Sequence, residues 1–202
     1  QMCIRDRYGE LLLEEFWRQR STVGIGASEK SQDKYISALK LDARAFRPIP
    51  GGKYQLSVRF EARAEEKIYG MGQYQQDCLD LKGCTLELAQ RNSQASVPFM
   101  VSNLGYGLLW HNPAIGEVTF GKNGTRWQAE VTDQMDYWIT AGDTPAEIVR
   151  QYGRATGTAP MMPSFATGFW QCKLRYRTQQ EVLEVAREYR RLHLPLSVIV
   201  ID

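Results

Sequence analysis

The sequence predicts a mainly β protein, in which an amino-terminal β-sandwich is followed by a single β-α-β unit. Over about residues 8–140, short runs of β-branched and aromatic residues alternate with glycine, asparagine, aspartate and proline, which is typical of antiparallel sheets. Helix-start signals then replace this pattern, and residues 198–201 form an uninterrupted apolar run, as in a parallel strand covered on both faces. We place the boundary in a proline-containing linker, which gives a sandwich domain with a short terminal helix at residues 1–160 and a second domain at residues 161–202.

The strands of the sandwich are predicted from alternation and turn residues. Residues 54–60 alternate apolar and polar side chains, the period of a half-buried strand. Residues 116–131 predict a β-hairpin with Asn123 and Gly124 at its tip, because this dipeptide supplies the two positive-φ residues of a type I′ turn. Residues 136–140 predict a further strand.

Two other segments of this domain are predicted to be turns or loops. Residues 69–74 contain two closely spaced glycines, which predict a tight turn beside a sheet. They are not a dinucleotide fingerprint, because neither a third glycine nor a helix follows at the required place. Residues 88–93 are polar and lie between two β segments, so we expect an ordinary loop there.

Two helices are predicted from capping boxes. Residues 144–147, Thr-Pro-Ala-Glu, place proline at the first helical position, and this helix is expected to end within residues 153–157. Residues 178–181, Thr-Gln-Gln-Glu, open a second helix whose apolar positions form one stripe. The stiff linker at residues 160–163 separates the two helices.

The second helix lies between two predicted strands. Residues 165–172 are apolar and aromatic and predict a buried strand, with residues 198–201 as its parallel partner. A two-stranded parallel sheet cannot bury both of its faces by itself. We therefore expect the natural protein to continue beyond Asp202.

The composition argues against several classes of function. The 202 residues carry 25 basic and 23 acidic side chains, a net charge of +2, so no electrostatic argument favours nucleic acid or an anionic membrane. No apolar run approaches the ~18 residues of a membrane span, and the amino-terminal residues lack the apolar core of a signal peptide. The four cysteines have no C-x-x-C spacing and only two histidines exist. We therefore expect no metal, no cofactor and reduced thiols in a cytoplasmic protein.

Candidate binding residues lie close to the ends of the predicted parallel strands. Asp202 directly follows the second strand, and the carboxyl ends of parallel strands form the active-site face of α/β folds. A cap for a following helix or loop explains Asp202 about equally well. Trp170, Gln171 and Leu174 lie at or just after the end of the first strand, where aromatic rings stack on sugars and polar groups bind hydroxyls. For each of these three residues taken alone, packing or solvent exposure is the better interpretation.

The order and spacing of five segments resemble glycoside hydrolase family 31. These segments are residues 68–73 (IYGMGQ), 97–102 (VPFMVS), 105–110 (GYGLLW), 163–172 (PSFATGFWQC) and 194–202 (LPLSVIVID). The first three resemble the family's galactose-mutarotase-like sandwich, and the last two resemble the first and second strands of its (β/α)₈ barrel. The resemblance covers about residues 8–202, whereas the first seven residues match nothing in it, and both a native origin and an artefact of sequence origin are compatible with them.

This resemblance implies a retaining α-glycosidase that acts on terminal α-linked sugars. Retention requires a nucleophile and a general acid/base carboxyl about 5–5.5 Å apart. In the family these carboxyls follow barrel strands four and six, whereas this sequence reaches strand two. The resemblance therefore implies that the 202-residue chain contains no catalytic residue and is inactive by itself.

The resemblance also implies a substrate-binding subsite. Asp202 aligns with the family aspartate that accepts hydrogen bonds from hydroxyls of the non-reducing-end sugar. Leu174 aligns, within one residue, with a position where relatives often have an aromatic side chain, so leucine departs from that pattern. Asn92, or Arg91 beside it, falls in the loop that the sandwich sends over the active site, although relatives often have aspartate there. Trp170 completes the set of predicted sugar-binding residues.

The expected partner is an oligosaccharide or glycoside that ends in α-linked xylose or glucose. Residues 86–90 and 168–171 favour the α-xylosidase branch of the family over starch-type α-glucosidases. A stand-alone carbohydrate-binding sandwich is the alternative, but it does not explain the buried-strand pattern of residues 198–201. A sugar epimerase would need an internal His–Glu pair, against which the two histidines argue. Oligomerisation of the full-length protein is left open.

Overall fold

The structure, a computed structural model, describes residues 2–16 and 41–202. It divides into an amino-terminal unit, Gln1–Gly157, and a carboxy-terminal unit, Thr158–Asp202.

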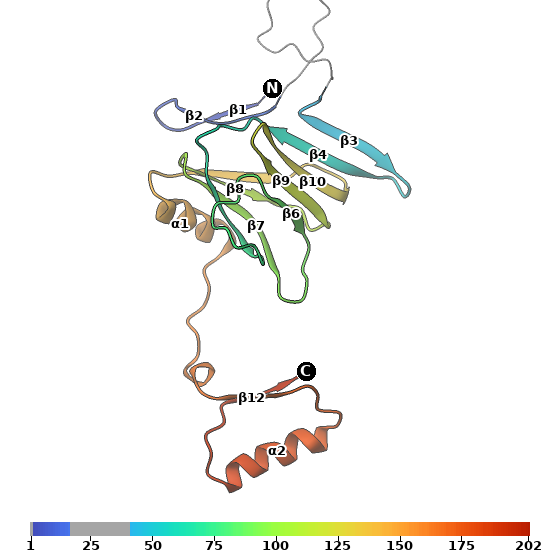
Figure 1. Ribbon diagram of the computed structural model, residues 1–202, viewed down its shortest axis with the longest axis vertical. Coiled ribbons are helices and arrows are strands. Elements are labelled where there is room, and N and C mark those ends of the chain that lie inside the picture. Colours follow the sequence, from blue (N-terminus) through green and yellow to red (C-terminus); the bar gives the residue numbers. More distant parts are fainter. Residues whose placement is uncertain (1, 17–40) are drawn as a thin grey trace, which may run out of the picture. The chain divides into compact units, whose positions relative to one another are not determined.

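Within the described residues, the amino-terminal unit contains two larger antiparallel sheets and a short strand pair (Figure 1). One sheet has the order β3-β4-β10-β9-β6, formed by Arg44–Ile49, Lys53–Phe60, Gly124–Thr132, Gly116–Gly121 and Thr85–Leu88. The other has the order β11-β8-β7-β5, formed by Tyr137–Ala141, Tyr106–Trp110, Ala95–Ser102 and Ile68–Gln73. All neighbouring strands in these sheets are antiparallel.

Side chains from both sheets share one apolar core. Its members include Leu56, Val58, Phe60, Val118, Phe120 and Trp127 from the first sheet, and Ile68, Met71, Met100, Leu108 and Trp110 from the second. Trp110 and Trp127 stack with ring centroids 5.7 Å apart, and Phe120 meets Trp127 edge-on at 5.8 Å. In β9, buried and half-buried residues alternate, as expected for a strand with one face on a core. The predicted mainly β fold with an amino-terminal sandwich is confirmed.

The predicted hairpin forms, but its tip differs from the prediction. Gly121 pairs with Gly124, so Lys122 and Asn123 make the connection between β9 and β10. Neither Asn123 nor Gly124 has a positive φ, so the predicted type I′ turn is wrong. A Cβ on Gly121 would lie 2.8 Å from the carbonyl oxygen of Gly124. Glycine is therefore needed here for the close approach of the strands, not for a left-handed turn conformation.

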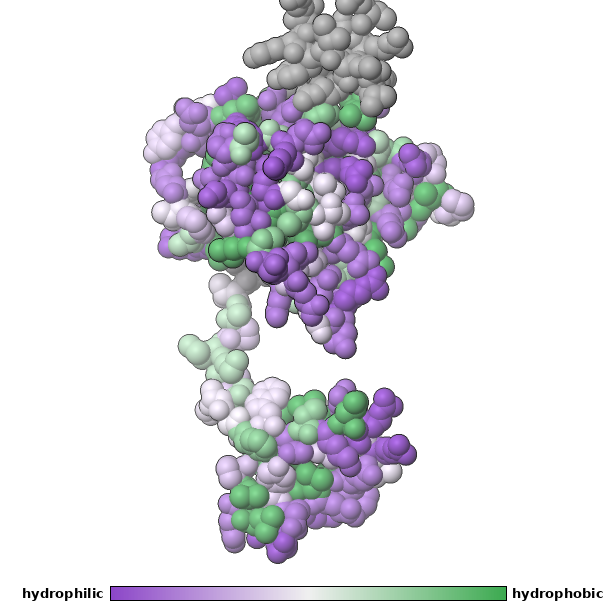
Figure 2. All heavy atoms as spheres, in the orientation of Figure 1, coloured by the Kyte–Doolittle hydropathy of each residue, from purple (hydrophilic) through white to green (hydrophobic). Residues whose placement is uncertain are grey.

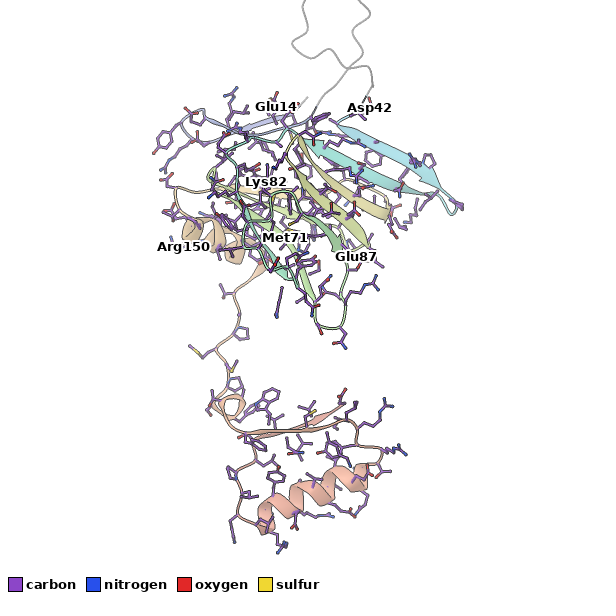
Figure 3. The ribbon with its side chains drawn as sticks, viewed as in Figure 1. Glu14, Asp42, Met71, Lys82, Glu87 and Arg150 are labelled. Atoms are coloured by element: carbon purple, nitrogen blue, oxygen red, sulfur yellow. The ribbon has the colours of Figure 1, made fainter. Side chains whose placement is uncertain are left out.

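Residues 68–73 form a bulged strand, so the prediction of a turn beside the sheet is wrong. The register of β5 against β7 shifts between Gly70 and Gly72. Met71 lies at this bulge with a φ of 69° and is fully buried (labelled in Figure 3). A Cβ on Gly72 would lie 2.2 Å from the carbonyl oxygen of Ala95, and Gly72 has a φ of 93°. The two glycines therefore permit a bulge that places Met71 in the core.

The first described residues form part of the fold, although they match nothing in the resemblance to the family. β1 (Cys3–Arg5) pairs antiparallel with β2 (Leu11–Glu14). The Asp6 carboxylate accepts the N–H groups of Tyr8 and Glu10, each at 2.8 Å, and so closes the turn between these strands. β1 was missed because the predicted β region begins at about residue 8, whereas the apolar run of β2 lies within that region.

The first predicted helix is present as α1 (Pro145–Thr156). The hydroxyl of Thr144 accepts the N–H of Glu147 at 3.2 Å, as a capping box requires. Ile148 is buried against Phe99 of β7, so the helix packs on the four-stranded sheet (Figure 1).

The carboxy-terminal unit contains β12 (Trp170–Lys173), α2 (Gln179–Arg191) and β13 (Val198–Ile201). The two strands pair in parallel, which confirms the predicted β-α-β unit. The hydroxyl of Thr178 accepts the N–H of Glu181 at 3.2 Å, so the second capping box also forms. The described residues of this unit make a two-stranded sheet and do not close a barrel.

The strand predicted at residues 165–172 is wrong in its start. Ser164–Thr167 is a 3-10 helix, η2, in which the Thr167 hydroxyl donates to the Ser164 carbonyl at 2.8 Å. Such side-chain contacts compete with extended backbone, and the strand begins only at Trp170. The strand is largely exposed because β13 is its single partner among the described residues, and apolar groups are visible on this unit (Figure 2).

Candidate functional site

Two predicted site residues lie at the same edge of the parallel sheet. Lys173 and Ile201 are paired in register as the last residues of β12 and β13. Leu174 and Asp202 follow them directly, so both lie at the carboxyl end of the sheet. Leu174 is 79% exposed, and Asp202 is also exposed. This edge therefore places a carboxylate and an apolar side chain at neighbouring positions.

Trp170 lies at the opposite end of the strand from this edge. It is the first residue of β12 and pairs with Val198, whereas the sequence placed it at the strand's end. Its indole N–H donates to the carbonyl of Ala166 at 3.0 Å, and half of the residue is exposed (51%). A sugar-binding role for Trp170 stays a prediction. To contact a sugar bound at the edge that carries Asp202, the Trp170 side chain would have to reach along the whole of β12.

The amide of Gln171 is occupied by two tyrosines. Tyr189 donates its hydroxyl to Gln171 Oε1 at 2.6 Å, and Gln171 Nε2 donates to the Tyr176 hydroxyl at 3.2 Å. Tyr176 is buried, and the ring of Tyr189 stacks on that of Phe169 at 5.9 Å. Gln171 thus joins β12 to α2, a structural role that its sequence position did not reveal.

A hollow beside Leu174 is lined by charged side chains. Its lining residues are Lys173, Leu174, Arg175, Tyr176, Arg177 and Glu181. The Lys173 ammonium lies 5.7 Å from the centre of the Tyr176 ring. The Arg177 N–H, at 2.6 Å from Glu181 Oε2, is the main cause that lowers the pKa of the Glu181 carboxyl. The edge next to Leu174 is therefore polar and carries more positive than negative groups.

Asn92 lies at a tight turn in the amino-terminal unit. The turn connects β6 in one sheet to β7 in the other. Arg91 and Gln94 form an isolated bridge around Asn92 and Ser93, and Ser93 has a φ of 66°. Asn92 is exposed, while Arg91 makes a bidentate ion pair with Glu87 at 2.5 and 2.9 Å. The bonds from Arg91 lower the pKa of the Glu87 carboxyl.

The base of the Asn92 turn is held by side chains that no motif in the sequence indicates. Gln90 bonds the backbone of Ser96 twice, donating to its carbonyl at 2.7 Å and accepting its N–H at 3.0 Å. Tyr74 donates its hydroxyl to the Glu87 carbonyl at 2.8 Å, and the same hydroxyl lies 2.7 Å from Ser96 Oγ. A side-chain amide therefore replaces a strand partner here. No local sequence pattern predicts the contact between Tyr74 and Ser96, because the two residues are 22 positions apart.

The two units each contain part of the predicted site. Leu174, Trp170 and Asp202 belong to the carboxy-terminal unit, and Asn92 belongs to the amino-terminal unit. The structure brings Leu174 and Asp202 to one edge and places Trp170 at the other end of β12. Their roles in binding stay predictions.

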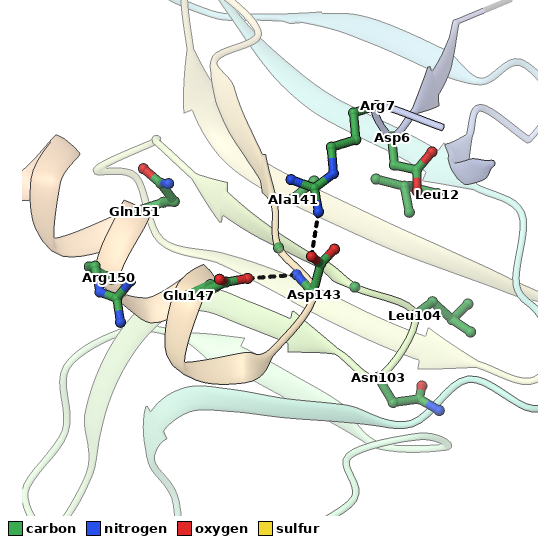
Figure 4. A pocket seen from close by; sticks show the side chains of 12 residues that line it. Asp6, Arg7, Leu12, Asn103, Leu104, Ala141, Asp143, Glu147, Arg150 and Gln151 are labelled. Atoms are coloured by element: carbon green, nitrogen blue, oxygen red, sulfur yellow. Dashed lines mark hydrogen bonds and ion pairs between the residues drawn. The ribbon is translucent and has the colours of Figure 1, made fainter. Parts of the chain in front are cut away.

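A second hollow, of about 540 Å³, lies in the amino-terminal unit (Figure 4). Arg7 and Asp143 form an ion pair across it, and the Asp143 N–H donates to the Glu147 carboxylate at 2.9 Å. Asp143 is the main cause that raises the pKa of Arg7. The ion pair therefore links the amino-terminal turn to the segment that leads into α1.

The described residues contain neither a metal-ligating cluster nor a membrane-spanning helix. In residues 2–16 and 41–202, no group of three or more histidine, cysteine, aspartate or glutamate side chains is arranged to hold a metal ion. No helix in this part of the chain is long and apolar enough to cross a membrane.

Models of two domains match the chain. The glycosyl hydrolase 31 N-terminal galactose mutarotase-like domain matches residues 2–119, and the glycosyl hydrolases family 31 TIM-barrel domain matches residues 159–202. The first match includes the strand pair at the amino terminus.

Relatives with related names match over most of the chain. A protein of Pseudescherichia vulneris named uncharacterized family 31 glucosidase is 74% identical over 202 residues, which is 100% of this chain and 38% of the relative. The α-xylosidase of Saccharolobus solfataricus is 36% identical over 158 residues, 74% of this chain and 22% of the relative. The crystal structure of an α-xylosidase from a soil metagenome, complexed with xylose, has a TM-score of 0.80 and 63% identity over 98% of this chain and 29% of that one. The chain thus spans well under half the length of each.

Proposed function

The chain belongs to glycoside hydrolase family 31, and from this membership we propose that it forms part of an exo-acting α-glycosidase that removes terminal α-linked xylose from oligosaccharides. Two of its relatives are named α-xylosidases, and one of these is complexed with xylose. Glucose is the second candidate sugar, because the relative that is 74% identical carries the name of a glucosidase.

The adjacent positions of Leu174 and Asp202 carry the proposal for substrate binding. Both follow strands that are paired in register, so both lie at the carboxyl end of the sheet. A carboxylate accepts hydrogen bonds from sugar hydroxyls, and such charge-assisted bonds contribute about 1.5–3 kcal/mol. The apolar Leu174 side chain covers less of a sugar ring than an aromatic residue would. We therefore assign the main contact to Asp202.

The proposed reaction proceeds with retention of configuration. It needs a nucleophile and an acid/base carboxyl about 5–5.5 Å apart, one to form a glycosyl-enzyme and the other to protonate the leaving oxygen. We place both groups outside these 202 residues. In this scheme the chain contributes substrate positioning, and Asp202 holds the sugar as its ring distorts towards the transition state.

Xylose and glucose differ by one hydroxymethyl group, so discrimination rests on the shape of the pocket. A single extra group of this size changes transition-state binding by only about 1–3 kcal/mol in an apolar pocket. We therefore expect turnover of both sugars, with α-xylosides preferred by a factor of roughly 10–200.

The test compares the 202-residue chain with the same chain extended to the length of its relatives. Aryl α-xyloside and aryl α-glucoside are the substrates, and the anomer first released is identified by NMR. The extended chain should release α-xylose, whereas the 202-residue chain should show no turnover above buffer. Turnover by the shorter chain would contradict the placement of the carboxylates, and release of β-xylose would contradict retention.

The variant Asp202→Asn in the extended chain tests the subsite. If the contact tightens in the transition state, kcat should fall and KM should rise, while the melting temperature stays unchanged. A lowered melting temperature with an unchanged kcat/KM would show that Asp202 is a structural cap. Leu174→Ala is the matched control at the same edge, and we expect it to affect KM more than kcat.

A further inference from the structure

Two of the four cysteines lie next to each other in the structure. Cys78 Sγ and Cys84 Sγ are 3.7 Å apart, and the two residues are six positions apart in the sequence. Cys78 is exposed, and Cys84 is partly buried against the sandwich core. Cys3 lies on β1 and Cys172 lies in the carboxy-terminal unit, and both are exposed.

Cys84 is the fixed member of this pair. Its carbonyl accepts the N–H of Phe120 at 2.9 Å, and its N–H donates to the carbonyl of Leu81, also at 2.9 Å. Gly83 donates its N–H to the Phe120 carbonyl at 2.6 Å, so this turn is anchored on β9. The sulfur of Cys84 therefore has a defined position beside the start of β6.

Cys78 is the adjustable member. Residues 74–84 contain neither helix nor strand, so movement of Cys78 breaks no pairing between strands. A disulfide needs a sulfur–sulfur distance of about 2.05 Å, and the exposed side chain of Cys78 can close the remaining gap. Asp80, two residues after Cys78, accepts the N–H groups of Ile68 and Lys82, each at 3.0 Å. These bonds hold the segment in place, so Cys78 stays close to Cys84.

We propose that Cys78 and Cys84 form a reversible dithiol/disulfide site that reacts with small-molecule disulfides such as oxidised glutathione. The exposed Cys78 thiolate attacks one sulfur of the reagent, forms a mixed disulfide and releases one small thiolate, which takes a proton from water. Cys84 then gives its proton to solvent, attacks the Cys78 sulfur and expels the second small thiolate. Two protein thiols and one disulfide thus become one protein disulfide and two small thiols.

The order of the two steps follows from the surroundings of the sulfurs. Burial raises the pKa of the Cys84 thiol, and its hydrogen bond with Cys78 and the nearby carboxylates of Asp80 and Asp77 act in the same direction. A thiol with a raised pKa provides little thiolate at neutral pH, and thiolate is the nucleophile. Cys78 is therefore the attacking thiol, and Cys84 is the resolving thiol. The new bond would close residues 78–84 into a ring beside the start of β6.

Trypsin provides a direct test on the unmodified chain, because Lys82 lies between the two cysteines. The folded chain is incubated with oxidised glutathione, quenched in acid, alkylated, denatured and digested. The peptides 68–82 and 83–91 should appear as one linked species with two hydrogens fewer than their sum, and dithiothreitol should separate them. Cys3 and Cys172 should instead carry glutathione and act as internal controls for single thiols.

Two variants separate the proposed sequence of steps from simple modification of exposed thiols. Cys84→Ser should abolish the linked species and leave glutathione on Cys78, because no resolving thiol remains. Cys78→Ser should abolish the linked species and leave Cys84 modified more slowly than Cys3. Glutathione on both Cys78 and Cys84 of the unmodified chain without a linked species would overturn the proposal, as would linkage of either cysteine to Cys3 or Cys172 in comparable yield.

Discussion

Glu66 and Lys82 form an ion pair inside the amino-terminal unit, with Lys82 Nζ 3.0 Å from Glu66 Oε2. The Glu66 side chain is 4% exposed and the Lys82 side chain is 9% exposed. The other oxygen of Glu66 accepts hydrogen bonds from the hydroxyls of Ser102 at 2.8 Å and Tyr106 at 2.5 Å. A buried carboxylate is stable only when its charge and its lone pairs are satisfied, and three donors do so here. Because Lys82 lies in the turn before Cys84, the pair also anchors that turn to the unit's interior (Lys82 is labelled in Figure 3).

Replacement of Lys82 by methionine should destabilise the amino-terminal unit strongly. The change keeps the apolar stem but leaves the Glu66 charge buried without its counter-ion, which typically costs about 3–5 kcal/mol. Urea unfolding of the variant measures this loss. Lys122→Met, at the exposed tip of the β9–β10 hairpin, is the matched control and should change the unfolding free energy by less than about 0.5 kcal/mol.

A double variant separates the lost charge from lost packing. Glu66→Gln combined with Lys82→Met removes both charges, so it should recover part of the stability lost in Lys82→Met alone. Additive losses in the double variant would show that the ion pair does not couple the two residues.

Tyr106 should give the unit a steep loss of stability at alkaline pH. Burial, the charge of Glu66 and the hydrogen bond to Glu66 raise the pKa of Tyr106 well above its usual range. The unfolded chain releases the Tyr106 proton near pH ~10, whereas the folded chain keeps it. The stabilising contribution is therefore complete below pH ~10 and is lost as the pH rises towards the folded-state pKa, by up to about 1.4 kcal/mol per pH unit.

Tyr106→Phe isolates this contribution from those of other tyrosines. The variant should be less stable at neutral pH, because Glu66 loses a donor, but its unfolding free energy should fall less steeply above pH ~10. Urea titrations between about pH 8 and 11 measure both slopes. Parallel slopes for the two proteins would contradict the raised pKa of Tyr106.

Gly107 should not tolerate alanine, because α1 packs directly against it. A Cβ there would lie 2.7 Å from Ile148 Cγ2 and 2.7 Å from Phe99 Cζ. Phe99 also stacks on Tyr152 with ring centroids 4.2 Å apart, so it has little freedom to move. We expect Gly107→Ala to lower the free energy of unfolding by about 1–3 kcal/mol, as measured by thermal unfolding.

Gly124→Ala is the control for this substitution and also tests the hairpin. At Gly124 the nearest atoms to a new Cβ belong to the Phe16 ring at 3.4 Å, and φ is not positive. The unfolding free energy should therefore change by less than about 1 kcal/mol. A type I′ turn at Asn123 and Gly124 would instead make alanine at Gly124 clearly destabilising.

Gln90→Ala should loosen the base of the Asn92 turn. It removes both hydrogen bonds to Ser96, and a neutral hydrogen bond contributes about 1 kcal/mol, so amide exchange at Ser96 should accelerate by roughly five-fold or more. Gln76→Ala, on a neighbouring exposed loop, should leave the exchange at Ser96 unchanged. Gln90→Glu keeps the acceptor for the Ser96 N–H but places a carboxylate oxygen against the Ser96 carbonyl, so it should rescue little.

Local sequence signals predicted the elements whose stabilising contacts are local. The capping boxes at Thr144 and Thr178 predicted both helix starts, because the hydroxyl and the N–H that it accepts are three residues apart. Alternation predicted the strands of the hairpin, since one face of each packs on the core. The apolar run at residues 198–201 predicted a parallel strand because such a run is typical of a strand covered on both faces.

Turns and strand ends were predicted less well, because several local conformations fit the same residues. Asn123 and Gly124 are compatible with a type I′ turn, but the pairing of β9 with β10 shifts the tip by one residue. Residues 68–73 are compatible with a turn, but burial of Met71 makes them a bulged strand. In both cases the partner strand selects the conformation, and the partner is distant in sequence.

The sequence by itself determined the fold class and both helix starts, and its motifs resembled those of the family to which the chain belongs. The tertiary structure alone decided which side chains meet: Glu66 with Lys82, Gln90 with Ser96, and Cys78 with Cys84. Contacts of this kind depend on the register of strands and on the path of the turns between them. Residue spacing does not specify either one, since the free energy that selects them comes from packing and burial across the whole unit.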